Sequence, residues 1–378
     1  MNLDFSEEQL ILRTAARDFL EAECPAKLLR EIMEGEELYA PQLWGKVAGL
    51  GWLSLIFPEE YGGADGTFFD FVALLEETGR ALLPLPLLQT VIAGLAVLKA
   101  GNERLKSTIL PDIVSGRIKA TMAIAEEGGD YHHDTVTTRA VTSNNGYIIT
   151  GSKSFIQYAP IMDKIIVAAR TSGDSGENGI TLFVVDGKDS RIDCKQLKST
   201  TGAKYYHVIL DGVTVPSDMV LGEVDKGWPI VSQMLLFDAA ARCAVALGSA
   251  TRVLEMTVDI AKTRIQFGRP IGTFQAVQQL CAEILIDVDS IKYLTYQAAG
   301  MLAQDIPCAR EVAIARVGTD AAYKRLVALA VKTHGGVGFT RDHDVGLHFL
   351  NAVDDELPFS HADYYRRTIA REFIITGV

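Results

Sequence analysis

The chain has 378 residues, of which 48% are hydrophobic and 22% are charged, and 36 basic against 48 acidic side chains give a net charge of −12. A chain this apolar, with 15 Phe and 12 Tyr, can build a large core, which excludes the disordered and collagen-like classes. The acidic balance argues against nucleic acid as a partner, because phosphate backbones are bound by Lys and Arg.

Five cysteines are far apart and form no C-x-x-C pair: Cys24, Cys194, Cys243, Cys281 and Cys308. This spacing speaks against a disulfide framework or a structural zinc site and indicates free thiols in a reducing compartment. The first eight residues have neither the basic nor the apolar stretch of a secretory signal, so we predict a cytoplasmic protein.

The first third of the chain is predicted to be helical. Ser6 and Gln9 have the spacing of a capping box ahead of an amphipathic helix. Further helical patterns cover residues 41–48, 68–79, 86–100 and 103–115. Residues 81–98 carry no charge, but Pro84 and Pro86 leave only about a dozen residues for one continuous helix, so we expect a buried core helix and no membrane span.

Short β-branched runs follow, at residues 136–141, 147–150, 164–169, 180–185 and 207–210. Asn144-Asn145-Gly146 predicts a hairpin turn, and Asp211-Gly212 predicts a second. Helical periodicity then returns over residues 230–266, 273–304, 307–334 and 360–374. The sequence therefore predicts an α+β protein with a helical domain (1–118), a middle antiparallel, barrel-like β domain (119–222) and a C-terminal bundle of long helices (223–378).

Three motifs stand out in the C-terminal part of the chain: RIQFGRPIGTFQAVQ at 264–278, HGGVGFT at 334–340 and IARE at 369–372. They resemble the signature string, the glycine turn and the C-terminal ending of the acyl-CoA dehydrogenase family. The resemblance extends over essentially the whole chain, and it implies the helix–strand–helix fold, a flavoprotein oxidoreductase and FAD as cofactor. In the family the glycine turn belongs to the FAD site of a neighbouring subunit, which implies an oligomer, a dimer or a tetramer.

The residues of these motifs are compatible with a dinucleotide. A guanidinium such as that of Arg264 can pair with phosphate, and the ring of Phe267 can lie against a flat heterocycle. From the residues alone, the favoured explanation is that Phe267 is a core side chain and that the nearby arginines are cations at a helix C-terminus. The resemblance favours the cofactor and implies this set of FAD-binding residues: Arg264, Phe267, Gln275, Lys332, Gly335, Gly336, Glu126, Phe155 and Gln157.

The chain departs from the family pattern at the flavin-facing segments. Ala125 stands where a hydroxyl is expected to bind the flavin ring, and Lys332 stands where the family commonly has Gln. Phe155 keeps an aromatic wall in place of Trp, and Gln157 takes the position of a Thr or Ser that donates to the flavin. The resemblance therefore implies an altered flavin site.

Dehydrogenation of a thioester requires a carboxylate base in a dry, apolar site. Counting back from the C-terminal motif puts Phe359 at the family's common base position, and Phe359 cannot act as a base. A second branch carries its base on the first long C-terminal helix, where the register gives Asp238; Glu356 is the fallback. An ion pair with Arg242, which follows four residues later on the same helical face, is an alternative role for Asp238.

The resemblance thus implies an FAD-dependent acyl-CoA dehydrogenase that acts on bulky thioesters, steroid-derived ones included, and passes electrons to an electron-transfer flavoprotein. The alternative is a non-catalytic partner subunit of a heteromeric assembly, motivated by Ala125 and by the missing C-terminal Glu. His132, His133 and Asp134 invite a metal site, but adjacent side chains of an extended segment point to opposite faces, so a polar loop without metal is expected.

Overall fold

The computed structural model describes residues 5–340, 342–354 and 362–376. The chain divides into two compact units, each described here by itself. Unit 1 contains Met1–Arg30, Phe68–Leu83 and Ala239–Val378, and unit 2 contains Glu31–Thr67 and Pro84–Asp238.

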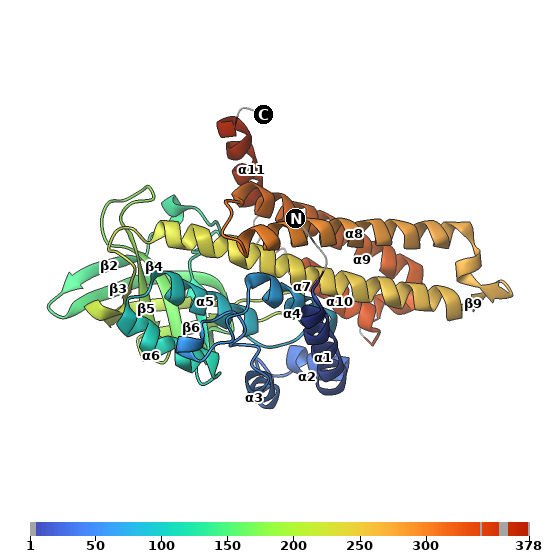
Figure 1. The fold of residues 1–378 in the computed structure, drawn as a ribbon, viewed down its shortest axis with the longest axis horizontal. Helices are drawn as coiled ribbons and strands as arrows, with labels where there is room; N and C mark the ends of the chain where they lie inside the picture. Colours follow the sequence, from blue (N-terminus) through green and yellow to red (C-terminus); the bar gives the residue numbers. More distant parts are fainter. Residues whose placement is uncertain (1–4, 341, 355–361, 377–378) are drawn as a thin grey trace. The chain divides into compact units, whose positions relative to one another are not determined.

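The helices belong to the two ends of the chain, as predicted (Figure 1). Ser6 and Gln9 form the expected capping box, in which each side chain accepts a hydrogen bond from the backbone of the other residue. Two short helices, α2 and α10, escape prediction. The helices are α1 (Glu7–Glu23), α2 (Ala26–Glu34), α3 (Pro41–Gly49), α4 (Phe68–Ala81), α5 (Leu87–Ala100), α6 (Glu103–Val114), α7 (Trp228–Thr263), α8 (Gln275–Leu302), α9 (Ala309–His334), α10 (Asp344–Asp354) and α11 (Ala362–Thr376).

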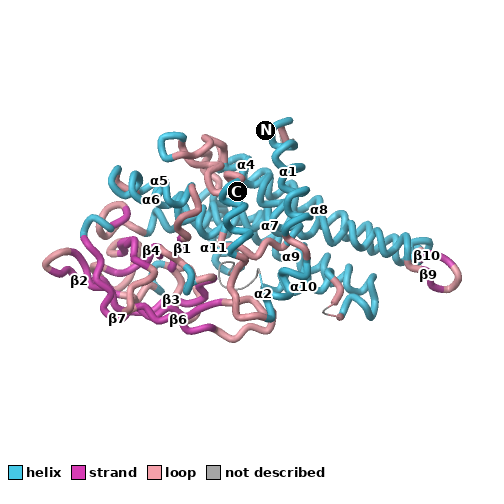
Figure 2. The backbone as a smooth tube through the Cα atoms, turned by 90° about the horizontal axis from the view of Figure 1, so that it is seen from below, coloured by secondary structure: helices cyan, strands magenta, loops and turns pink. Residues whose placement is uncertain are grey.

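Unit 2 is built on one sheet, seen as the magenta strands in Figure 2. Within the described residues it has eight strands in the order β6-β7-β3-β2-β4-β5-β8, with β1 paired to β4. The sheet is mostly antiparallel, as expected, but β1 and β2 each run parallel to β4. The strands are β1 (Ala120–Ala123), β2 (Arg139–Ser143), β3 (Gly146–Gln157), β4 (Lys164–Arg170), β5 (Ile180–Asp186), β6 (Ile192–Gln196), β7 (Tyr205–Pro216) and β8 (Val220–Leu221).

The two predicted hairpin turns have different outcomes. Asn144 and Asn145 connect β2 to β3, with Ser143 paired to Gly146, so the first turn is confirmed. The second prediction is wrong, because Asp211 and Gly212 lie inside β7. The pairing of β3 with β7 shifts its register next to Asp211, and Gly212 takes a φ of 71° there. A Gly that tolerates positive φ serves a β-bulge as well as a turn.

Unit 1 is helical, and its core lies among α7, α8, α9 and α10. Two glycines bring α4 and α7 into backbone contact. A Cβ added at Gly79 would lie 1.9 Å from the carbonyl oxygen of Val245, and one at Gly248 would lie 1.7 Å from that of Glu76. Only residues without a side chain fit this crossing.

Helix α5 is buried from Leu87 to Val97, apart from Gln89. Among the described residues, α7 is long and apolar enough to cross a membrane by length and composition. However, 67% of its most apolar stretch is buried inside the protein, and a core helix passes the same test. The expected absence of a membrane span stays a prediction.

Candidate active site

The proposed base, Asp238, lies on α7 and is only 8% exposed. Phe237 and Ala239 on either side are also buried, and Nζ of Lys99 on α5 lies 5.3 Å from the centre of the Phe237 ring. Burial among apolar side chains is the kind of environment that favours proton abstraction from carbon by a carboxylate. The catalytic role of Asp238 stays a prediction. The fallback, Glu356, and the position of Phe359 lie outside the described residues.

A β-bulge in β3 shapes the segment that contains Phe155. Lys153 pairs with Val208 of β7 and Ile156 pairs with Tyr206, so two residues of β3 face one residue of β7. Phe155 adopts a φ of 62°. This left-handed conformation is costly for a bulky side chain, and such strain is concentrated at functional sites. The half-buried ring is thereby turned out of the alternating pattern of the strand.

A buried ion pair between Lys153 and Glu126 anchors the same segment. Nζ of Lys153 donates to Oε1 of Glu126 at 2.8 Å and to the carbonyl oxygen of Ile124 at 3.0 Å. The backbone N–H groups of Thr137 and Thr138 also donate to Glu126, each at 2.9 Å. Burial by itself raises the pKa of Glu126, but Lys153 and these donors outweigh it and lower the pKa to about 2. These bonds tie Glu126 to β3 through Lys153 and to the residues that precede β2, so the carboxylate supports the segment.

Gln157 ends β3, and both ends of its amide are held inside unit 2. Its Oε1 accepts from Nε2 of Gln89 at 2.7 Å, and its Nε2 donates to the hydroxyl of Tyr205 at 3.1 Å. Ala125 is 1% exposed, and its carbonyl oxygen accepts from the N–H of Ser154 at 2.9 Å. The amide of Gln157 keeps one N–H for a ligand, since an amide nitrogen carries two.

The signature string forms the end of α7 and a short hairpin in unit 1. Strands β9 (Ile265–Gln266) and β10 (Arg269–Pro270) flank Phe267 and Gly268, whose φ values of 53° and 80° are those of a type I′ turn. The Phe267 side chain is 90% exposed, so its interpretation as a core residue is wrong. The guanidinium of Arg269 lies 4.3 Å from the centre of the Phe274 ring, which steadies the hairpin. Gln275 is exposed at the first position of α8.

The glycine turn meets the end of α7 in three dimensions. Nη1 of Arg264 donates to the carbonyl oxygen of His334, the last residue of α9, at 2.5 Å. Gly335 follows with φ 68° and ψ −146°, a conformation that is essentially restricted to glycine. A Cβ at Gly336 would meet nothing within 4 Å, so its backbone is open to a ligand. Lys332 is exposed on α9.

His334 was missed as a site residue by sequence reasoning. Its ring is fully buried, Nδ1 bonds to the carbonyl oxygen of Ala330 at 2.8 Å, and Nε2 has no hydrogen-bond partner among the described residues. Burial, His343 and Arg264 lower the pKa of His334. Next to Arg264 and Gly335 the protein thus holds a buried ring nitrogen whose hydrogen-bonding capacity is unused among the described residues.

These unit 1 residues fit a phosphate-bearing flavin cofactor. Arg264 offers guanidinium N–H groups, Gly336 offers an uncovered backbone, and Phe267 offers an exposed aromatic face. Arg264 and His334 are 70 residues apart in sequence, so the fold itself assembles this group.

The histidine cluster belongs to a loop of unit 2. Single ligand atoms of His132, His133 and Asp134 lie within 4.8 Å of one another, closer than extended geometry predicts, because His133 begins a short 3₁₀ turn. Oδ1 of Asp134 accepts from the N–H of Gly176 at 2.6 Å, and this bond, with the histidines, lowers the pKa of Asp134. The carboxylate oxygen thus already organises the loop, which is the role expected from sequence.

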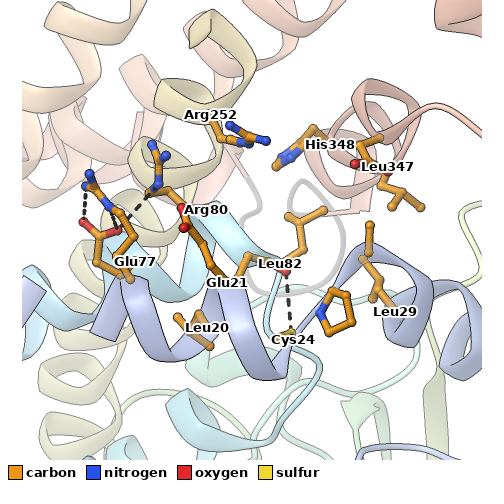
Figure 3. Close-up of a pocket in the computed structure, with 15 residues that line it drawn as sticks. Leu20, Glu21, Cys24, Leu29, Glu77, Arg80, Leu82, Arg252, Leu347 and His348 are labelled. Carbon is orange, nitrogen blue, oxygen red and sulfur yellow. Dashed lines mark hydrogen bonds and ion pairs between the residues drawn. The ribbon is translucent and has the colours of Figure 1, made fainter. Parts of the chain in front are cut away.

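A cavity of about 370 Å³ opens in unit 1 among α1, α2, α4, α7 and α10 (Figure 3). Arg17 and Arg80 line one side, and both contact the buried carboxylate of Glu77. Cys24 and Leu82 line an apolar side. The lining contains none of the predicted site residues, and its Arg17 and Arg80 are paired with its Glu77. The cavity is therefore distinct from the predicted chemistry.

Comparison with known proteins identifies the family. Models of the N-terminal, middle and C-terminal domains of acyl-CoA dehydrogenases match residues 6–117, 121–213 and 225–372. Acyl-CoA dehydrogenase FadE27 of Mycobacterium tuberculosis is 31% identical over 366 residues, with 94% of both chains covered. Caffeyl-CoA reductase-Etf complex subunit CarC of Acetobacterium woodii is 29% identical over 350 residues, covering 90% of this chain and 91% of the relative.

A solved structure has the same fold throughout. The ChsE4-ChsE5 complex of Mycobacterium tuberculosis matches with a TM-score of 0.89 and 31% identity over 99% of both chains. The predicted order of helical, β-sheet and helical domains is confirmed. The chain belongs to the acyl-CoA dehydrogenase family and is an FAD-dependent oxidoreductase that acts on CH–CH bonds.

Proposed function

We propose that this enzyme introduces the α,β double bond into an acyl-CoA thioester, with Asp238 as the base. The burial of this carboxylate on α7, next to Phe237 and Ala239, is the observation that carries the proposal. FAD, when bound, supplies the acceptor for the hydride that leaves the β-carbon. Asp238 takes the α-proton, and its dry surroundings keep water from competing for that proton.

The other predicted site residues bind FAD or hold the segments that contact it. Lys153 and Glu126 hold the bulged segment that presents Phe155, and Gln157 donates its remaining N–H to the flavin ring. Arg264, Phe267, Gly335 and Gly336 bind the dinucleotide, with Gln275 and Lys332 on the exposed ends of α8 and α9 as further contacts. An Asp is one methylene shorter than a Glu, which leaves room for a bulky acyl group, and we include steroid-derived thioesters in that class.

The test is Asp238→Asn in the FAD-loaded protein. We expect the variant to keep its flavin spectrum while dehydrogenation falls by at least about a hundredfold, the contribution of a positioned base. Asp259→Asn is the matched control, because Asp259 is an exposed carboxylate on the same helix. Unchanged turnover by Asp238→Asn would move the role to Glu356 or to another carboxylate.

A partner-subunit function is the second candidate. Ala125 has no hydroxyl for the flavin ring, and the chain is 31% identical to a protein of the ChsE4-ChsE5 complex. The chain would then lend Arg264, Phe267 and the glycine turn to a catalytic neighbour. Expression of this polypeptide alone, followed by a flavin spectrum and an acyl-CoA turnover assay, separates the two. Robust turnover by the single chain eliminates the partner-only function.

We further propose that a dimer or tetramer, of this chain or with a paralogue, passes its electrons to an electron-transfer flavoprotein in the cytoplasm. The relative CarC is a subunit of a caffeyl-CoA reductase-Etf complex, which supports this electron carrier. We also propose that the three domains span residues 1–118, 119–222 and 223–378. Stopped-flow reoxidation with purified electron-transfer flavoprotein, at several protein concentrations, tests both the carrier and the assembly.

A further inference from the structure

The cavity of about 370 Å³ in unit 1 combines polar and apolar walls. Figure 3 shows Arg252 of α7 and His348 of α10 near one another in its lining. Four leucines line the cavity as well: Leu20, Leu29, Leu82 and Leu347. Pockets of this size hold small organic molecules, and a few polar groups among apolar side chains fix how such a molecule is oriented. The lining therefore indicates a ligand with one polar end and an apolar body.

Arg252 is the last member of a chain of ion pairs that contains more cations than anions. Each member contacts at least one other, and the members are Arg13, Arg17, Arg80, Arg252, Glu76, Glu77 and Glu255. Four guanidinium groups thus face three carboxylates, which leaves at least one positive charge in excess. Among the described residues Arg252 contacts Glu255 alone, at 3.4 Å, and Glu255 is already bound by Arg80. The guanidinium of Arg252 therefore keeps N–H groups for a further partner.

Two other carboxylates line the cavity, and both lie next to an arginine other than Arg252. Asp344 pairs with Arg30 at 2.7 Å. Glu21 is exposed on α1, where its charge acts on Arg17. The excess of positive charge at Arg252 thus has no dedicated counter-ion among the described lining residues.

His348 brings a second hydrogen-bonding group to the same place. Its Nδ1 bonds to the hydroxyl of Ser249 at 2.6 Å, and no described residue bonds to its Nε2. Burial lowers the pKa of His348 to about 3, and Arg252 is the strongest of the charges that act in the same direction, so the ring is neutral with a single proton. A hydroxyl can donate to Nδ1 as well as accept from it, so Nε2 can carry that proton and donate it to a ligand.

The chemistry of this pair of side chains selects a carboxylate. A guanidinium binds a carboxylate through charge-assisted hydrogen bonds, and an imidazole N–H can donate to the same group. A cationic ligand would meet the excess of positive charge, and a plain hydrocarbon would leave the guanidinium without a partner. An acyl-CoA thioester has no carboxylate on its acyl carbon, because forming the thioester consumes it. The free acid is thus the form that this lining recognises.

We propose that the cavity is a second ligand site, which binds small monocarboxylic acids with the carboxylate on Arg252 and His348 and the apolar body along the leucines. The inference does not rest on the proposed dehydrogenase function, because none of the predicted site residues lines the cavity. For an acid of about ten heavy atoms we expect a dissociation constant on the order of 0.1–1 mM.

The experiment measures binding to the full-length, FAD-loaded protein by isothermal titration calorimetry. The ligands are 3-phenylpropionate and hexanoate, each compared with its primary amide, which has the same shape and no charge. The variants are Arg252→Met and His348→Phe, the second of which keeps a ring of similar size without its nitrogens. Arg310→Met is the matched control, because Arg310 on α9 lies outside the lining, is 39% exposed against 44% for Arg252, and also pairs with a glutamate.

In the wild type and in Arg310→Met we expect each acid to bind at least about tenfold more tightly than its amide. In Arg252→Met and in His348→Phe we expect this preference to fall at least about fivefold. Equal affinities of acid and amide in the wild type, or no binding of either acid, overturn the inference and need no variant. A preference that either variant retains in full also overturns it, because the carboxylate then lies elsewhere. Turnover of an acyl-CoA by the same preparation tests the dehydrogenase function separately.

Discussion

Replacement of Lys153 by methionine is expected to destabilise unit 2 severely. The lysine is completely buried, and its Nζ donates to the Glu126 carboxylate and to the Ile124 carbonyl oxygen. Methionine fills much of the same space but carries no charge, so Glu126 remains as a buried carboxylate without its cation.

The magnitude follows from the burial of both partners. Breaking a buried ion pair by removing one member costs about 3–5 kcal/mol, since the surviving charge stays desolvated. A cooperative unit of 150–250 residues loses about 2–4 °C of Tm per kcal/mol, so the melting temperature should fall on the order of 10 °C. Lys164 on β4 forms a 3.7 Å ion pair with Asp186 that is partly exposed to solvent. Lys164→Met should therefore lower the free energy of unfolding by at most about 1 kcal/mol.

The pH dependence gives an independent check. In the wild type the pKa of Glu126 is lowered to about 2, so this carboxylate contributes stability above its unfolded pKa and loses that contribution as the pH falls toward 2. In Lys153→Met burial is no longer opposed by the ammonium, so the pKa of Glu126 should rise. The variant should therefore lie closer to the wild type at pH 5 than at pH 8, because protonation removes the unpaired charge.

Urea denaturation followed by circular dichroism measures these differences. The double variant Lys153→Met/Glu126→Gln should be less destabilised than the sum of the two single variants, with a coupling of at least about 1 kcal/mol. Additive effects, or a loss in Lys153→Met no larger than in Lys164→Met, would refute the assignment of the pair as the support of the Phe155 segment.

Three further outcomes are expected. Arg264→Met should weaken FAD binding at least about tenfold in a flavin-release titration. The control Arg104→Met, which removes an exposed arginine of α6, should leave FAD affinity unchanged. Equal FAD affinities of the two variants would remove Arg264 from the cofactor site. Burial raises the pKa of Glu76 to about 7 despite the 2.8 Å ion pair with Arg13, so the wild type loses stability as the pH rises through this pKa. In urea titrations the free energy of unfolding of Glu76→Gln should therefore compare more favourably with that of the wild type at pH 8 than at pH 5. The reverse order would contradict this sign. Gly248→Ala should lower the free energy of unfolding by about 1–3 kcal/mol, because the added methyl group meets the main chain of α4. Gly45→Ala, with open space around the added methyl group, should not lower it. Similar free energies of unfolding for the two variants would show that the α4–α7 contact relaxes freely.

Much of the helical architecture could be predicted from periodicity, because long amphipathic helices repeat their pattern many times. The predicted helices over 230–266 and 307–334 end within three residues of α7 and α9. α2 and α10, of nine and eleven residues, were not predicted, whereas α3, also of nine residues, was: it begins with Pro41, a residue typical of the first helical position. Asp211-Gly212 was misread because one local chemistry serves both a hairpin turn and a bulge.

The site was predictable only where a motif carries it. The signature string and the glycine turn pointed to Arg264 and Gly335, and the fold does bring them together. Glu126 was predicted as a flavin contact, and this stays a prediction; what the sequence did not reveal is that its carboxylate pairs with Lys153 and accepts from the N–H groups of Thr137 and Thr138. The hydrogen bond from Gln89 to Gln157 depends on how a helix packs against a sheet, and residues that are 68 positions apart leave no periodic trace of such packing.

The glycine crossing of α4 and α7 limits how this chain can diverge. At Gly79 and Gly248 the obstacle to a larger residue is main chain, which cannot change rotamer to make room. A duplicated gene that drifts toward another acyl group must therefore keep both glycines. Substitutions that reshape the chain are better accommodated where the neighbouring atoms belong to side chains, which can change rotamer.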